Sequence, residues 1–192
     1  FFIVFTLLFA WRMRSDAVAS FVLIALILLW GLRLSIYITV RNHGKGEDRR
    51  YQAIRARNQP NFGFKSLYLV FLLQAVLAAV IVLPVVPILN GMRVADPVTY
   101  AGFAIAAFGA AFETVADAQM AQFKATRSAQ DTVMDRGLWR YSRHPNYFGE
   151  ICLWWGLWLI ALAGGAWWTA VGPALLTFLL LRVSGVALTE KD

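Results

Sequence analysis

Apolar residues are gathered into long runs with few charges, and most of these runs are long enough to cross a bilayer. A helix needs about 20 apolar residues to span the hydrocarbon core. In lipid the backbone polar groups must be paired within the segment, which favours helices. We therefore expect an all-α, polytopic transmembrane helix bundle with about five to six spans in this chain. Residues 1–11 form the end of one run, and the others cover residues 17–40, 66–89, 97–116, 147–163 and 166–184.

The composition leaves little room for a separate water-soluble domain. Hydrophobic residues make up 59% of the chain and charged residues 15%, whereas a soluble domain needs a polar exterior. We predict a single integral membrane domain over residues 1–192. The chain begins inside an apolar stretch without an initiator methionine, so we expect it to be truncated at the N-terminus and also at the C-terminus.

The net charge of +7 is distributed as in a multi-pass membrane protein. Basic residues concentrate in two segments between apolar runs, 41–65 and 117–146. The positive-inside rule places both segments in the cytoplasm. A nucleic-acid-binding protein would instead carry a basic stripe on a soluble fold, so we expect no nucleic-acid partner.

Cysteine and histidine usage excludes two kinds of site. The single Cys152 cannot form an internal disulfide framework. The two histidines, His43 and His144, lack the ligand spacing of a zinc site. We therefore expect no metal.

Ionisable residues lie within the apolar runs or at their edges, where a charge is expensive. They are Arg33, Glu113, Asp117, Glu150 and Arg182. One interpretation is that they line a shared polar pocket that opens to the cytoplasm. The other is that they pair with one another or extend to the membrane interface.

The segment 137–150 carries the most distinctive pattern, Gly-Leu-Trp-Arg-Tyr-Ser-Arg-His-Pro-Asn-Tyr-Phe-Gly-Glu. Pro145 is suited to the first turn of a helix, and Arg140, Arg143 and His144 precede it. A helix start beside cations favours an anionic ligand, typically a phosphate. The alternative is an interfacial anchor, in which aromatic residues form a belt and arginines face lipid phosphates.

The same segment resembles the signature of the steroid 5α-reductase-like membrane reductases, particularly their bacterial, uncharacterised branch. It is more distantly similar to the sterol reductases, which carry a related Arg-His-Pro-Asn-Tyr element. The likeness covers nearly the whole chain, and the run 143–150 is its most specific part. The weaker pieces are residues 30–34, 41–48, 117–119 with Lys124, and 181–185.

The resemblance implies a bundle of about seven transmembrane helices with NADPH in a cavity that faces the cytoplasm. Asn146 and Glu150 resemble residues that hold the nicotinamide end. The other cofactor-binding residues that it implies are Asn42, Lys45, Asp117, Lys124, Arg140, Arg143, His144, Tyr147 and Arg182. Trp30 stands where the steroid-reducing members carry a tyrosine, so we assign the catalytic roles to Tyr37, two turns further on, and to Glu150.

The function that we expect is NADPH-dependent reduction of a polarised carbon–carbon double bond in an apolar, steroid- or lipid-like enone. The protein would lie in a bacterial inner membrane, in contact with membrane lipids. Two alternatives remain open. The first is a membrane methyltransferase of the isoprenylcysteine carboxyl type, which uses S-adenosylmethionine. The second is a lipid-binding membrane protein without enzymatic activity.

Overall fold

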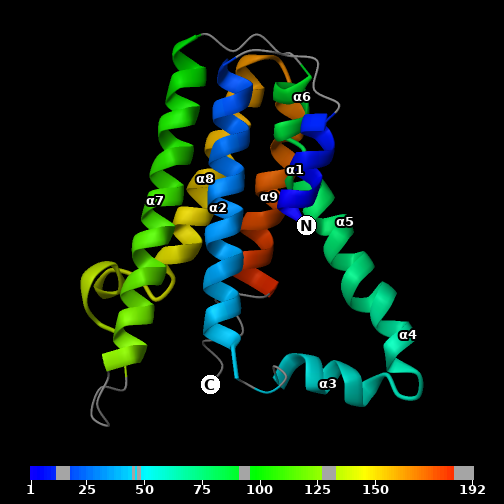
Figure 1. Cartoon of the computed structure of the whole chain (residues 1–192). Helices are drawn as coiled ribbons and strands as arrows, with labels where there is room; N and C mark the ends of the chain where they lie inside the picture. Colours follow the sequence, from blue (N-terminus) through cyan, green and yellow to red (C-terminus); the bar gives the residue numbers. More distant parts are fainter. Residues whose placement is uncertain (12–17, 45, 47–48, 91–95, 127–132, 184–192) are drawn as a thin grey trace.

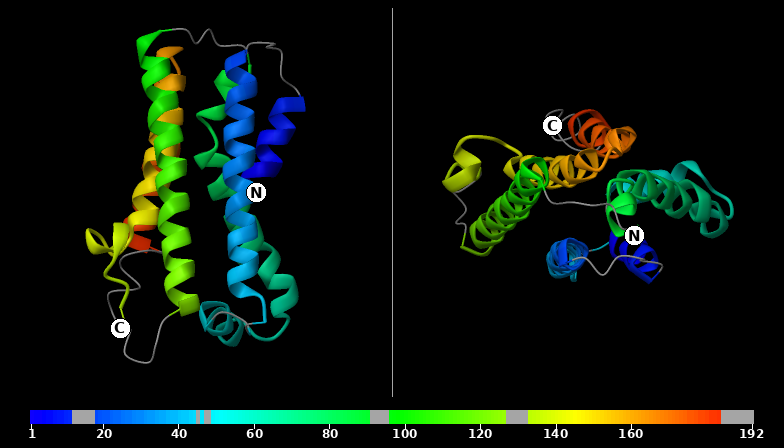
Figure 2. Two further views of the ribbon diagram at one scale, coloured as in Figure 1. Left: turned by 60° about the vertical axis from the view of Figure 1, so that its left-hand side comes forward. Right: turned by 90° about the horizontal axis from the view of Figure 1, so that it is seen from above.

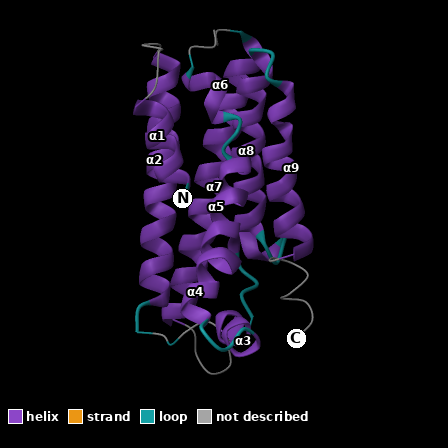
Figure 3. Cartoon of the chain, turned by 90° about the vertical axis from the view of Figure 1, so that its right-hand side faces the viewer, coloured by secondary structure: helices purple, strands orange, loops and turns teal. Residues whose placement is uncertain are grey.

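The computed structural model describes residues 1–11, 18–44, 46, 49–90, 96–126 and 133–183 (Figure 1). Within these ranges every regular element is a helix (Figure 3), so the predicted all-α fold is confirmed. The α-helices are α1 (Phe2–Trp11), α2 (Val18–Asn42), α3 (Arg49–Arg57), α4 (Phe62–Ser66), α5 (Leu73–Ile81), α6 (Val85–Leu89), α7 (Pro97–Thr126), α8 (Pro145–Ala163) and α9 (Val171–Phe178). The π-helical segments are η1 (Leu67–Leu72) and η4 (Leu179–Val183), and the 3₁₀ segments are η2 (Gly137–Arg140) and η3 (Trp167–Ala170).

Three helical stretches of the described chain are long and apolar enough to cross a membrane. They are Ser20–Asn42, Phe62–Ile81 and Pro97–Thr126. Phe2–Trp11 and Trp167–Val183 are apolar but shorter. Large apolar side chains such as Leu29 and Tyr100 lie exposed on the outer surface, as they do on a protein that faces lipid. The chain is therefore an all-α membrane helix bundle, and the larger number of spans stays a prediction.

Helices α7 and α8 pack against each other over most of their length (Figure 2). Glycines make this approach possible. A Cβ atom on Gly109 would lie 2.5 Å from the Gly149 carbonyl oxygen, and one on Gly156 would lie 2.5 Å from the Ala106 nitrogen. Small residues at such contacts let the backbones of membrane helices touch. The glycine and alanine residues of α7 therefore allow its close packing against α8.

The interior is built around an aromatic cluster contributed by α1, α2 and α8. The rings of Phe2 and Trp154 lie 5.0 Å apart, and Trp30 meets Trp154 edge-on at 5.8 Å. Trp154 is fully buried. Aliphatic side chains of α2, α6 and α8, among them Leu23 and Ile88, complete this core. It holds α2 beside the α7–α8 pair and so positions the polar groups described below.

The predicted continuous span over residues 66–89 is wrong. The helix begins earlier, at Phe62, and α5 ends at Ile81. A short turn then leads into α6. Pro84 explains the break, because it has no N–H to donate and its ring clashes with the preceding helical turn.

The two basic segments are also more helical than the sequence analysis predicts. Helix α7 continues for a further ten residues beyond the apolar run, to Thr126, so residues 117–126 are not a loop. Residues 41–65 contain α3, which lies across one end of the bundle in Figure 1. Helix α3 is rich in Arg and Ala, and residues 117–126 are rich in Ala and Gln. These residues have high helix propensity but do not form the continuous apolar run of a membrane span.

Candidate functional site

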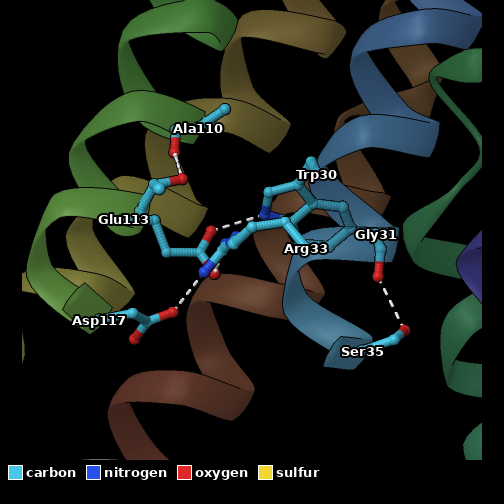
Figure 4. A network of polar contacts seen from close by, with 8 residues as sticks. Trp30, Gly31, Arg33, Ser35, Ala110, Glu113 and Asp117 are labelled. Atoms are coloured by element: carbon cyan, nitrogen blue, oxygen red, sulfur yellow. Dashed lines mark hydrogen bonds and ion pairs between the residues drawn. The ribbon is translucent and has the colours of Figure 1, made fainter. Parts of the chain in front are cut away.

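A polar network joins α2 and α7 in the interior of the bundle (Figure 4). Glu113 accepts a hydrogen bond of 2.6 Å from Trp30 Nε1 and lies 2.6 Å from Arg33 Nη2. The other terminal nitrogen of Arg33 pairs with Asp117 Oδ2. The side chains of Glu113 and Asp117 are 4% and 6% exposed, whereas that of Arg33 is 22% exposed. Charges within a membrane bundle are tolerated when they are paired in this way.

Sequence spacing accounts for the geometry of this network. Trp30 and Arg33 are three residues apart on α2, and Glu113 and Asp117 are four apart on α7. Both spacings put side chains on one face of a helix. The pairing interpretation is therefore confirmed for Arg33, Glu113 and Asp117. Glu150 on α8 is within electrostatic reach of all three, whereas Arg182 is exposed on η4.

A cavity of about 630 Å³ lies next to this network, at the end of the bundle where α3 crosses. Asp117 belongs to both, because it pairs with Arg33 and lines the cavity wall. Helix α2 contributes Tyr37 and Arg41 to the wall. The remaining lining residues are Met120, Phe123 and Lys124 from α7, Val133, Met134, Trp139, Arg143 and His144 from the segment that leads into α8, and Asn146 and Tyr147 from its first turn.

The segment before α8 is fastened to α7 by two hydrogen bonds. Leu138 N donates to Gln119 Oε1 at 2.9 Å, and Trp139 Nε1 donates to the Ala116 carbonyl at 2.9 Å. Gly137 begins the 3₁₀ turn with a φ of 58°, which a residue with a side chain rarely adopts. These contacts hold Arg143 and His144 beside the polar end of α7.

Helix α8 begins at Pro145, as the sequence predicts, and His144 occupies the N-cap position. His144, Asn146 and Tyr147 all line the cavity, so the first turn of α8 faces it. The rings of His144 and Tyr147 stack in parallel at 4.9 Å. Asn146 is in electrostatic contact with the Asp117 carboxyl group. Its Oδ1 atom is buried and has no hydrogen-bond partner in the structure.

The structure brings seven of the predicted site residues to one cavity. They are Tyr37, Asp117, Lys124, Arg143, His144, Asn146 and Tyr147. Arg41 also lines the cavity, although the sequence analysis did not assign it to the site. The sequence feature that could have identified Arg41 is its position one helical turn after Tyr37. In the structure the Arg41 guanidinium lies 5.8 Å from the centroid of the Tyr37 ring.

Four predicted site residues are not part of the cavity wall. Asn42 is exposed at the end of α2 and accepts a hydrogen bond of 3.4 Å from Arg41 Nε. Arg140 and Arg182 are also exposed. Glu150 lies one turn beyond Asn146 along α8, deeper in the bundle. Lys45 lies outside the described residues.

The cavity combines positive charge with hydrogen-bond acceptors. Arg41, Lys124 and Arg143 are cationic, and the start of α8 adds the positive end of a helix dipole. The Asp117 carboxyl group and the Asn146 amide supply acceptors on the side nearest the polar network. Among the described residues there is no group of three or more side chains suited to hold a metal ion. The arrangement suits a ligand that carries both anionic groups and an amide or hydroxyl donor.

Comparison with known proteins places this site in a family context. The chain matches, over residues 1–192, the family described as "Protein of unknown function (DUF1295)". No curated protein and no solved structure matches it. Because the family match covers the entire chain, the protein belongs to the DUF1295 family.

Proposed function

We propose that this DUF1295 family member is a membrane-embedded reductase that uses NADPH to reduce a polarised carbon–carbon double bond in an apolar, steroid- or lipid-like enone. The observation that carries the proposal is the make-up of the cavity wall, where cations from three segments surround a helix start that carries an unpartnered amide oxygen. A reduced nicotinamide dinucleotide has matching parts, since it carries anionic phosphates and a carboxamide.

The cationic side chains of the wall fit the phosphate groups. Arg41, Lys124 and Arg143 approach the cavity from three different segments, so they can contact phosphates spread along an extended molecule. Guanidinium groups bind phosphate through paired hydrogen bonds, and the helix start contributes its dipole. A volume of about 630 Å³ also falls within the range of about 300–1,000 Å³ typical of small-molecule sites.

The Asn146 amide fits the carboxamide of the nicotinamide. Its Oδ1 atom is a buried acceptor without a donor, and leaving such a group unpaired costs about 1–3 kcal/mol. A carboxamide N–H would remove that cost. Glu150 lies four residues further along α8 and so shares a face of the helix with Asn146. We assign to Glu150 a role in holding the same end of the cofactor.

When bound, the reduced nicotinamide supplies a hydride for the electron-poor carbon of the substrate, while a proton goes to the neighbouring carbon. Tyr37 is the proposed proton donor, because it lines the same cavity as Asp117. The Arg41 guanidinium over its ring stabilises the negative charge that remains when the proton leaves. Catalysis by the protein then consists of orienting the reactants and stabilising charge.

The membrane setting supports an apolar substrate. A molecule dissolved in the bilayer reaches a helix bundle from its side, whereas a water-soluble dinucleotide reaches it from the end that faces the aqueous phase. We place the protein in a bacterial inner membrane as a multi-pass protein, with the cationic cavity open to the cytoplasm. The basic residues of α3 lie at that same end of the bundle, as the positive-inside rule predicts.

The test is a binding titration of the purified full-length protein with NADPH, NADH and S-adenosylmethionine. We expect Asn146→Ala to weaken NADPH binding by about tenfold, since a hydrogen bond contributes about 0.5–1.5 kcal/mol. Asn90→Ala is the matched control, because Asn90 is exposed at the end of α6, which lies at the opposite end of the bundle. It should leave the affinity unchanged.

The other ligands give the test its alternatives. Selective binding of S-adenosylmethionine would contradict the reductase proposal and favour a methyltransferase. A folded protein that binds none of the three molecules, and whose stability depends on anionic lipid, would contradict both enzymatic functions. Equal NADPH affinity in Asn146→Ala and Asn90→Ala would contradict the assignment of the nicotinamide end to this cavity.

A further inference from the structure

A further hollow lies between the start of α8 and η4, the segment that continues α9. It has a volume of about 530 Å³. Phe148 and Leu181 in its wall are 50% and 45% exposed, so the hollow opens on the surface that the protein presents to lipid. We refer to it as the α8–η4 groove.

The α8–η4 groove changes from polar to apolar along α8. Before the helix begins, its wall is formed by Tyr141, Ser142 and Arg143, which carry two hydroxyl groups and a guanidinium. Within the helix, its wall is formed by Phe148 and Ile151, which are three residues apart and share one helix face. Helix α8 runs from the end of the bundle where α3 crosses toward the opposite end (Figure 1). The apolar part of the groove therefore lies deeper in the membrane than the polar part.

The polar part of the groove suits a phosphate group. Arg143 is exposed, and its guanidinium can form paired hydrogen bonds with phosphate oxygens. The Ser142 hydroxyl oxygen accepts a hydrogen bond of 3.1 Å from His144 N, a bond that does not use the serine's own O–H donor. The described residues that line the groove include neither Asp nor Glu. A headgroup with a net negative charge is therefore favoured over a zwitterionic one, whose ammonium group would find no carboxylate in this wall.

The apolar part of the groove distinguishes a lipid from a water-soluble anion. Phe148, Ile151 and Leu181 have side chains that can only pack against other apolar groups. At the polar end Tyr141, which is 84% exposed, carries the kind of ring that membrane proteins place at the level of the lipid headgroups. A phospholipid has the same two parts in the same order, with its phosphate at the interface and its acyl chains below.

The groove and the cationic cavity share the start of α8 but are different sites. Arg143, His144 and Tyr147 line both hollows. The apolar side chains of the groove do not line the cavity, and Asp117 and Asn146 of the cavity do not line the groove. An anion in either hollow therefore reduces the positive charge that Arg143 offers to the other.

We propose that the α8–η4 groove binds an anionic phospholipid, whose phosphate contacts Arg143 and Ser142 and whose acyl chain follows the apolar side chains on α8 and η4. The assignment goes beyond the proposed reductase function and does not depend on it. If the cavity holds NADPH, the lipid and the cofactor compete for the Arg143 guanidinium. The anionic lipid content of the membrane then sets how much cofactor is bound at a given NADPH concentration.

Native mass spectrometry of the purified full-length protein tests this proposal. The protein is freed of lipid in detergent and titrated with phosphatidylglycerol or phosphatidylcholine that carry identical acyl chains, and the apparent Kd of the first bound lipid is measured. We expect the anionic lipid to bind about fivefold more tightly, since the attraction of an anionic lipid to one arginine contributes about 1 kcal/mol. Inorganic phosphate at the same concentration should not displace it, because phosphate has no acyl chain.

Two pairs of variants locate the bound lipid. Arg143→Ala should remove most of the preference for phosphatidylglycerol. Arg140→Ala is its matched control, because Arg140 is exposed three residues earlier and lines neither hollow. Ile151→Trp fills the apolar part of the groove and should weaken phosphatidylglycerol binding about fivefold. Ile105→Trp makes the same change at an exposed position of α7 outside the groove and should leave the affinity unchanged.

Each outcome supports or overturns the site. Equal affinity for the two lipids in the wild type would overturn the assignment to an anionic lipid, and this comparison needs no variant. Equal losses in Arg143→Ala and Arg140→Ala would mean that the lipid responds only to total charge. Equal affinities in Ile151→Trp and Ile105→Trp, or displacement of the lipid by inorganic phosphate, would contradict an acyl chain in the groove. Lipid binding that meets all these expectations in a protein that does not bind NADPH would reject the reductase and support the lipid site.

Discussion

The contact between α7 and α8 predicts a large effect from the smallest possible substitution, Gly109→Ala. A Cβ atom at this position would lie 2.4 Å from Leu153 N and 2.5 Å from the Gly149 carbonyl oxygen. Ordinary van der Waals contacts of a Cβ atom lie at 3.4–4 Å. Both obstructing atoms belong to the backbone of α8, so no side-chain rotation can relieve the overlap. The helices themselves must separate at this level.

The size of the effect follows from two opposing contributions. Overpacking of a close contact costs about 1–3 kcal/mol, and a clash with backbone belongs at the upper end of that range. Alanine gains about 1 kcal/mol over glycine in helix propensity. We therefore expect Gly109→Ala to lower the free energy of unfolding by about 2 kcal/mol. For a chain of this size that corresponds to a fall in Tm of roughly 4–8 °C.

Gly63→Ala is the matched control, since it makes the same chemical change in a helix where nothing lies within 4 Å of the added atom. Only the propensity contribution remains there, so the variant should be as stable as the wild type or slightly more stable. Thermal unfolding of both variants in one detergent, followed by circular dichroism, measures the difference. A Tm of Gly109→Ala equal to that of Gly63→Ala would refute the close approach of the two helices.

Other contacts lead to predictions of different size. Arg33→Met should lower the free energy of unfolding by about 3–5 kcal/mol, because buried carboxyl groups lose their cation. Adding Glu113→Leu should restore part of this loss in a denaturant titration. No recovery in the double variant would mean that the two side chains do not interact. Asp96 Oδ1 accepts a hydrogen bond of 2.8 Å from Thr99 N at the start of α7, so Asp96→Ala should cost about 1 kcal/mol in the same assay, and an unchanged midpoint would contradict the cap. Lys124→Glu should weaken NADPH binding about tenfold at low salt and less at high salt. If the affinity for NADPH depended neither on this charge nor on salt, Lys124 would not bind the phosphates.

The helices that face lipid could be predicted from the sequence, because burial in a membrane leaves a direct compositional signal. The run 17–40 corresponds closely to α2, and the predicted helix start at Pro145 is confirmed. The polar half of α7 could not be predicted in this way. Residues 117–126 form a helix because they continue an existing one, and Asp117 and Lys124 among them line the cavity at one end of the bundle.

The candidate site was predictable where it depends on local sequence and not where it depends on helix orientation. Asn146 and Tyr147 lie at the start of α8, and the local pattern placed them there before any tertiary contact was known. Arg140 and Arg182 share the charge of Arg143 but do not line the cavity. The direction of a side chain depends on the rotation of its helix about its axis, which is set by packing against neighbouring helices.

The backbone contacts between α7 and α8 have a mechanical consequence. At Gly149 an added Cβ atom would lie 2.6 Å from the nitrogen of Glu113, so the backbone of α8 touches α7 at the residue that accepts the hydrogen bond from Trp30. The two helices can neither slide nor rotate against each other without a collision of their backbones, and therefore move as one rigid unit. Any movement that admits a large molecule to the cavity must come from other parts of its wall. Outside this pair the cavity wall comes from α2 and from residues 133–144, which are fastened to α7 by the backbone of Leu138 and the indole of Trp139, and spectroscopic labels on these two segments would show which of them moves.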